Sequence, residues 1–205
     1  QAGVYEELLS SAYEPDWIAG VSIGAINAAL IAGNPPERRI ERMTEFWHTV
    51  SSGMGPLSHA FTTTQDADTA AAAAAWPRGL FNQFSAFWSM VAGIPGFYHP
   101  RMPPSNLHPE GTHAAISVYD TAPLRATLER LIDFDLINSK KVRLSVGAVN
   151  VVTGNSEYFD NFERTIGPEH VMASGALPPA FPPVVIDGES YWDGGIVCNT
   201  PLQYV

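Results

Sequence analysis

The five residues Gly20–Gly24, Gly-Val-Ser-Ile-Gly, constrain the fold of this chain more than any other segment. A short apolar run at 15–19 precedes them and is typical of a buried strand, while 25–32 is rich in helix formers. Glycine on either side of a serine lets the backbone turn tightly and lets strand and helix approach closely. The segment therefore predicts a strand–turn–helix unit that presents the Ser22 hydroxyl, as a nucleophile, at a helix N-terminus.

Composition places the chain among ordinary globular domains. A length of 205 residues predicts one domain with a single sizeable core. Apolar residues make up 45% and charged residues 16%, which excludes a disordered or coiled-coil chain. The net charge of −10 argues against nucleic acid as a partner. Cys198 is the one cysteine, so an internal disulfide framework is excluded.

The rest of the chain alternates helical and strand patterns, which predicts an α/β layered fold. No internal repeat is visible. Helices are expected at 2–12, 25–32, 37–50, 123–132 and 168–174, and strands at 15–19, 142–149, 158–159, 184–186 and 191–192.

The segment 51–118 differs from both flanks and is interpreted as an insert. It holds many prolines, a six-alanine run at 70–75 and a group of aromatic residues between 76 and 98. Apolar residues at helical spacing predict one amphipathic helix within it, at Leu80, Phe84, Phe87, Trp88 and Val91. Two readings stay open: this aromatic-rich helical insert packs on the main core, or it forms a lid over a cleft for apolar substrates.

A serine hydroxyl needs a base to remove its proton. In one arrangement the base is a histidine held by a carboxylate, and the best such triad in this chain is Ser22, Asp160 and His170. An α/β-hydrolase, however, builds several strands before its elbow, whereas only about twenty residues precede Ser22 here. The six histidines also lack metal-ligand spacing, so neither a metal nor another cofactor is expected; they are residues 48, 59, 99, 108, 113 and 170.

The other candidate base is Asp193, which follows a short strand and is held by Gly194 and Gly195. Considered alone, an Asp-Gly pair is a common turn. Together with the early serine segment it resembles the patatin-like phospholipase family. Further matching segments are Gly3-Val4 with its helix, 173–178 (Ala-Ser-Gly-Ala-Leu-Pro), 181–183 (Phe-Pro-Pro) and 199–201 (Asn-Thr-Pro).

This resemblance covers roughly 3–50 and 142–203 and is weak over the insert. It implies a three-layer fold with a mostly parallel sheet between helices, and catalysis by a serine–aspartate dyad without histidine. Ser22 would be the nucleophile, Asp193 its base, and the Ile23 N–H a donor to the oxyanion. The motif glycines are Gly20, Gly24, Gly194 and Gly195.

The family places a further glycine-rich oxyanion loop just before the Gly3 position, and the sequence starts after it. We therefore expect a single domain over 1–205 that is truncated at both ends. The bacterial members imply the bacterial cytoplasm as the compartment. No signal peptide is visible, nor an apolar run of roughly 18 residues or more that could span a membrane.

The resemblance implies a lipid acyl hydrolase that acts on a lipid or another acyl ester, with transient contact to a membrane or micelle. Two alternatives stay open beside it. One is a non-catalytic acyl- or lipid-binding module on the same fold, and the other is the histidine triad described above. A nucleotide-binding protein is disfavoured because neither G-x-G-x-x-G nor G-x-x-x-x-G-K-[ST] occurs.

Overall fold

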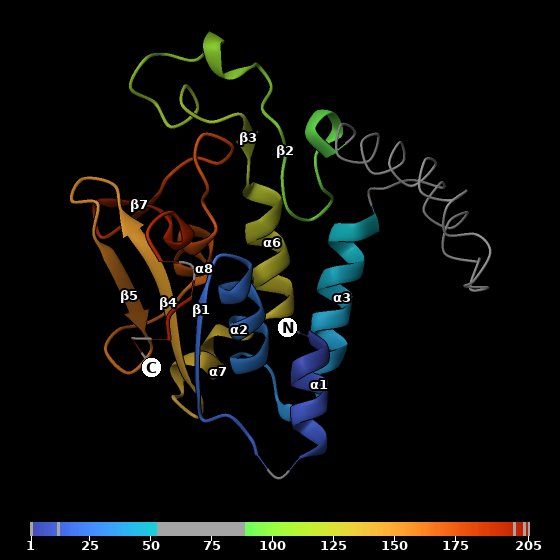
Figure 1. The fold of residues 1–205 in the computed structure, drawn as a ribbon. Coiled ribbons are helices and arrows are strands. Elements are labelled where there is room, and N and C mark those ends of the chain that lie inside the picture. Colours follow the sequence, from blue (N-terminus) through green and yellow to red (C-terminus); the bar gives the residue numbers. More distant parts are fainter. Residues whose placement is uncertain (1, 12, 53–88, 199, 203, 205) are drawn as a thin grey trace, which may run out of the picture.

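The structure of the chain is a computed structural model, and it describes residues 2–11, 13–52, 89–198, 200–202 and 204. The elements are α1 (Ala2–Ser10), β1 (Trp17–Val21), α2 (Ile23–Ala32), η1 (Pro36–Arg38), α3 (Arg39–Ser51), β2 (His99–Pro100), η3 (Ser105–Leu107), β3 (Tyr119–Asp120), α6 (Ala122–Leu131), α7 (Phe134–Asn138), β4 (Arg143–Asn150), β5 (Ser156–Asp160), α8 (Pro168–Ser174), β6 (Val184–Ile186), β7 (Glu189–Asp193) and η4 (Gly194–Ile196). Figure 1 shows the helices gathered beside one sheet.

The expected α/β architecture is confirmed, but the main sheet is mixed rather than mostly parallel. Only the β1–β4 pair is parallel among the pairings of its five described strands, and β4–β5, β4–β7 and β6–β7 are antiparallel. For two of these pairs the reason is local: short turns join β4 to β5 and β6 to β7, and a short turn can only join antiparallel strands.

Strand β4 is the centre of the sheet, and two strands share one of its edges. Strand β5 pairs with β4 over Ser145–Val149. Strand β1 pairs over Arg143–Gly147, and β7 pairs over Ala148–Asn150. A strand can pair along two edges only, and β5 occupies one edge of β4. Strands β1 and β7 must therefore both lie along the other edge, one after the other. Since β1 runs parallel to β4 and β7 antiparallel, their C-terminal ends meet between Gly147 and Ala148.

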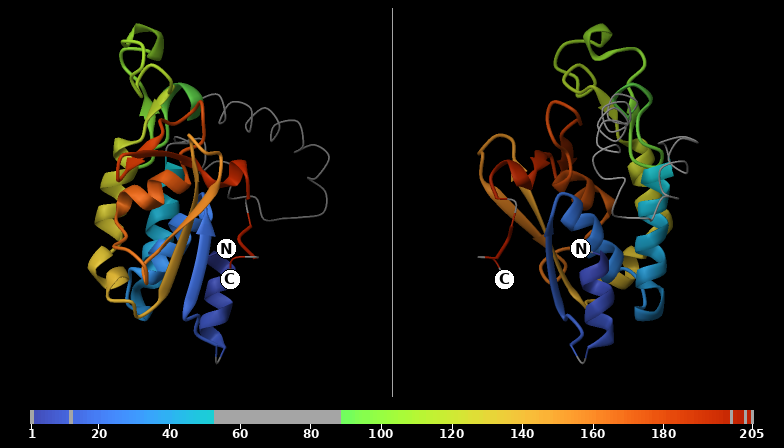
Figure 2. Two further views of the ribbon diagram at one scale, coloured as in Figure 1. Left: turned by 90° about the vertical axis from the view of Figure 1, so that its left-hand side faces the viewer. Right: turned by 45° about the vertical axis from the view of Figure 1, so that its right-hand side comes forward.

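One face of the sheet packs against helices to form the core. Leu144, Val146 and Ala148 of β4 lie on this face and are fully buried, and the apolar residues of α2 and α8 belong to the same cluster. The other face carries Trp17 and Tyr158, and Tyr204 packs against both rings. The described residues from η4 to Tyr204 therefore lie on the side of the sheet opposite the core helices, where Figure 2 shows the red end of the chain.

Helical spacing in the sequence predicts a buried stripe in each of two helices, and most of its residues are buried or half-buried, although Trp47 is 38% exposed; the residues are Ile40, Met43, Phe46, Trp47 and Val50 in 37–50, and Leu124, Leu128, Leu131 and Ile132 in 123–132. In α3, Met43 and Phe46 are buried, as are the leucines of α6. For the first helix, helical spacing predicts a buried face of Val4, Leu8, Leu9 and Ala12. The first three stay largely exposed and Ala12 lies outside the described residues, whereas Tyr5 is buried. The Tyr5 hydroxyl contacts a buried arginine of α3, Arg39, whose Nη1 donates to it at 2.8 Å. The face of α1 that carries Tyr5 therefore packs against the rest of the domain.

The described part of the insert is tied to the loop after α8. Most of the predicted amphipathic helix and the alanine run lie outside the described residues. Strands β2 and β3 pair with each other, and the backbone N–H groups of Val118 and Tyr119 donate to the carbonyls of Pro179 and Ala180. The rings of Tyr98 and Tyr119 lie 5.2 and 6.1 Å from the ring of Phe181.

A buried carboxylate joins β4 to β5. Asp160 is fully buried, and its Oδ2 accepts from Arg143 Nε at 2.8 Å and from Ser145 Oγ at 2.7 Å. Burial raises the pKa of this carboxyl, but the hydrogen bonds from Ser145, the Phe162 N–H and Arg143 outweigh that effect and hold the pKa below the ordinary value of an aspartate. Asp160 is therefore an ionised structural group.

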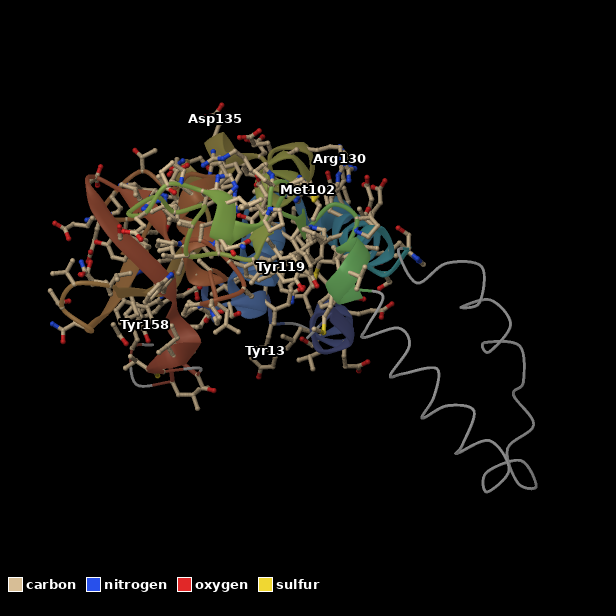
Figure 3. The ribbon with its side chains drawn as sticks, turned by 90° about the horizontal axis from the view of Figure 1, so that it is seen from above. Tyr13, Met102, Tyr119, Arg130, Asp135 and Tyr158 are labelled. Atoms are coloured by element: carbon tan, nitrogen blue, oxygen red, sulfur yellow. The ribbon has the colours of Figure 1, made fainter. Side chains whose placement is uncertain are left out.

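Asp160→Asn is expected to lower the free energy of unfolding by about 1–3 kcal/mol, because it removes the charge that three donors stabilise. Since folding lowers the pKa of Asp160, its contribution is present above the ordinary pKa of an aspartate and is lost as the pH falls through the lower, folded-state value. Urea unfolding at pH 7 and at several pH values below 4 measures both effects. Asp135→Asn is the control, since Figure 3 shows Asp135 at the rim of the molecule, pointing outward. Equal stability of the two variants at pH 7 would contradict this account.

Candidate active site

The predicted turn at Ser22 is present between β1 and α2. Ser22 has φ 56° and ψ −127°, a left-handed conformation that is unfavourable for a residue with a side chain. Gly20 makes the turn possible, because a Cβ there would overlap the carbonyl of Gly24 and lie 2.6 Å from Ala25 N. The backbone of β1 thus passes directly against the first turn of α2, and Gly24 lies half-buried at that contact.

Asp193 lies at the end of β7, where this strand meets β1 along the edge of β4. Its side chain is buried, with only 4% of the residue exposed. Its Oδ1 accepts from Gly195 N at 2.7 Å, and its own N–H donates to Ala176 O at 3.0 Å. One backbone hydrogen bond thus holds the carboxylate, and the other holds the main chain of the residue that carries it.

The structure brings Ser22 and Asp193 together although 171 positions separate them. Ser22 Oγ donates to Asp193 Oδ2 at 2.6 Å. This distance lies within the range expected when a hydroxyl donates to a carboxylate. Ser22 is partly exposed whereas Asp193 is buried, so a molecule can reach the serine from outside while the carboxylate behind it is shielded from water.

Ile23 is the first residue of α2, so its N–H has no intrahelical partner. No other acceptor for it is found in the described part of the chain. Its position directly after Ser22, at a helix N-terminus, gives the amide the polarity that stabilises a nearby negative charge. The geometry is compatible with the predicted oxyanion donor.

The two glycines after Asp193 have different tasks. A Cβ at Gly194 would lie 2.6 Å from the carbonyl oxygen of Gly147 and 3.0 Å from Val21 Cγ1, so only glycine fits between β4 and β1. Gly195 donates its N–H to Asp193, as described above. Gly194 therefore permits the close approach, and Gly195 holds the carboxylate.

Sequence reasoning missed the part that α8 plays. Ser174, at its end, accepts a hydrogen bond from Ser22 N at 2.9 Å, and Ala176 accepts the bond from Asp193 N. Both residues lie in the 173–178 segment, which contributed to the family resemblance. Nothing in the spacing of residues relates that segment to the serine turn, because the contact between Ser22 and Ser174 spans 152 positions and arises only in the folded chain.

The alternative triad is not assembled. The Asp160 carboxylate is engaged by Arg143, Ser145 and the Phe162 N–H. His170 Nδ1 accepts from Gly167 N at 2.9 Å, at the opposite end of α8 from Ser174. Burial lowers the pKa of His170, which keeps the ring neutral in this structural role. In the described chain, Asp193 is the side chain to which the Ser22 hydroxyl donates.

Within the described residues, no group of three or more histidine, cysteine or acidic side chains is placed to hold a metal ion. The same part of the chain contains no helix long and apolar enough to cross a membrane.

Comparison with known proteins identifies the family of the chain. A family model described as "Patatin-like phospholipase" matches residues 1–205. The chain belongs to the patatin-like phospholipase family. Among solved structures it is similar to one described as "Crystal structure of VipD from Legionella pneumophila", at 16% sequence identity and a TM-score of 0.48. That match covers 98% of this patatin-like chain and 44% of the other, and no curated protein matches.

Gly194→Ala is expected to lower the free energy of unfolding by about 1–3 kcal/mol, because the added methyl group must displace the Gly147 carbonyl. Gly3→Ala is the matched control, since a Cβ at Gly3 has open space around it. Chemical unfolding of both variants measures the difference. If Gly194→Ala were as stable as Gly3→Ala, the close approach of η4 to β4 would be wrong.

Proposed function

We propose that this patatin-like chain hydrolyses carboxylic esters of lipids through a Ser22–Asp193 dyad and an acyl-enzyme. The observation that carries the proposal is the 2.6 Å hydrogen bond from Ser22 Oγ to Asp193 Oδ2. It points the proton of the hydroxyl at the carboxylate, which is the alignment that general-base activation requires. Membership of the family supports lipid acyl hydrolysis as the general activity.

In the first half of the proposed reaction, Asp193 Oδ2 takes the proton as Ser22 Oγ attacks the ester carbonyl. The carbonyl oxygen becomes an oxyanion, and the Ile23 N–H donates to it. The intermediate then collapses: the bond to the alcohol oxygen breaks, and Asp193 returns its proton to the departing alcohol. The acyl group is left on Ser22.

In the second half, water attacks the acyl-enzyme and Asp193 takes one of its protons. The ester bond to Ser22 breaks, the serine oxygen recovers the proton, and the fatty acid leaves. One residue thus serves as base and acid in turn. No histidine is needed because the carboxylate contacts the hydroxyl directly.

Exposed apolar side chains close to the dyad support a lipid as the substrate. Ile23 follows the nucleophile, Leu177 follows the Ala176 carbonyl that holds Asp193, and Ile196 and Val197 follow the glycine pair. All four are 37–56% exposed. We propose that these residues, here called the apolar rim, contact the acyl chains of a membrane or micelle. The lid role of 51–118 stays a prediction.

Ser22→Ala is expected to reduce hydrolysis of a short p-nitrophenyl ester by at least about 10⁴-fold, because it removes the nucleophile. Asp193→Asn is expected to cost about 10²- to 10⁴-fold, the usual contribution of a general base. His170→Ala should retain most of the activity, since His170 has a structural role. Initial rates with each purified full chain measure these effects.

Covalent labelling by a fluorophosphonate separates the enzyme from a non-catalytic lipid-binding module. An activated Ser22 reacts and an unactivated serine does not. Labelling that persists in Ser22→Ala, or that is absent from the unmodified chain, would contradict the proposal. Loss of activity in His170→Ala with full activity in Asp193→Asn would favour the histidine triad.

Leu177→Asp is expected to reduce the rate on micellar ester by about tenfold, because burying a leucine side chain in lipid is worth at least about 1.5 kcal/mol. The rate on a dissolved short ester should change little. Val185→Asp is the matched control, since Val185 on β6 is 48% exposed, as is Leu177. Equal rates of both variants on micelles would contradict a lipid contact through the apolar rim.

A further inference from the structure

Ser174 lies at the C-terminal end of α8 and is fully buried. Its hydroxyl makes two hydrogen bonds to the backbone of other elements. Oγ accepts from Ser22 N at 2.9 Å and donates to Gly147 O at 2.6 Å. The hydroxyl therefore bridges the serine turn and the central strand β4.

The position of this bridge follows from the sheet. The parallel ladder between β1 and β4 ends at the pair Val21 and Gly147. At the next residue the chain turns away into α2, so the Ser22 N–H cannot bond directly to β4. The Ser174 hydroxyl fills that gap by accepting from Ser22 and donating to Gly147. Without this hydroxyl, the Ser22 N–H and the Gly147 carbonyl would each lose a hydrogen-bond partner next to a fully buried side chain, which is unfavourable.

The bridge also restrains the conformation of the nucleophile. A hydrogen bond to the Ser22 N–H fixes the plane of the Val21–Ser22 peptide, and that plane together with φ 56° sets the direction of the Ser22 side chain. The left-handed φ is unfavourable for serine, so it persists only where surrounding contacts hold it. Ala176, two residues after the end of α8, accepts the hydrogen bond from Asp193 N. The short segment 174–176 thus contacts both members of the dyad.

We propose that Ser174 is a positioning residue: its hydroxyl, placed between Ser22 N and Gly147 O, holds the Ser22 side chain in the orientation that meets Asp193. This inference rests on the proposed function for its effect on catalysis. It also implies that the Ser22 N–H, being engaged, does not serve the oxyanion, which leaves that task to Ile23 and to donors outside the dyad.

The test compares Ser174→Ala with Ser145→Ala in the full chain. Ser145 is an equally buried serine of β4 whose hydroxyl also accepts one bond and donates one, from Trp17 Nε1 and to Asp160. Both variants lose a buried hydroxyl and some stability. Ser174→Ala is expected to lower kcat by about 10- to 100-fold with KM nearly unchanged, because a small misplacement of the nucleophile is costly. Ser145→Ala should keep kcat, with both assayed well below their unfolding temperatures.

Amide hydrogen exchange of Ser22, followed by NMR, gives a readout that needs no activity. In Ser174→Ala the Ser22 amide should exchange at least about tenfold faster than in the unmodified chain, whereas Ser145→Ala should not change it. Unchanged exchange in Ser174→Ala would overturn the bridge.

The two proposals fail separately. If Ser174→Ala keeps the kcat of the unmodified chain while Ser22→Ala is inactive, the positioning role is wrong and the proposed function stands. If Ser22→Ala keeps full activity, the proposed function is wrong, and the exchange of the Ser22 amide alone decides whether the bridge exists.

Discussion

The division of one edge of β4 between β1 and β7 is the constraint on which the site depends. The two strands approach from opposite directions, and their ends meet between Gly147 and Ala148. Ser22, which follows β1, and Asp193, which ends β7, are thereby brought into contact. Both residues lie directly at strand ends and not on long loops. Gly194 makes the contact possible, because any larger residue would be pushed against the Gly147 carbonyl.

The hydrogen-bond partners of Ser22 and Asp193 include backbone groups as well as side chains. Asp193 is held through Gly195 N and Ala176 O, and Ser22 through the Ser174 hydroxyl. Backbone groups of packed strands and helix ends have little freedom to move, so they hold a carboxylate and a hydroxyl at short range at little further entropic cost. This explains how a residue with φ 56° can persist at the centre of the site.

The parts of the fold that could be predicted from the sequence are those that local chemistry determines. The glycines at 20 and 24 and the apolar runs beside them predicted the turn at Ser22, and helical spacing predicted α3 and α6. The direction of β7 could not be inferred from periodicity, because a pattern of alternation does not say which neighbour a strand pairs with. The buried Tyr5 face of α1 was missed since its partner, Arg39, lies in another helix. Asp193 as the partner of Ser22 came from the family resemblance and not from spacing, and the contact of Ser174 gave no sequence signal at all.

Because β1 and β7 end side by side on β4, the distance between Ser22 and Asp193 does not depend on how many residues connect the two strands. Because the pairing with β4 fixes both ends, the connecting segments can gain or lose residues at their surface without moving either side chain. Slippage of β1 or β7 by one residue, in contrast, would shift its end by about 3.3 Å and turn its side chains to the opposite face. Such a scaffold tolerates variation in its loops far better than variation in its strand register, so changes in substrate preference can arise in the segments that surround the dyad while the chemistry stays in place.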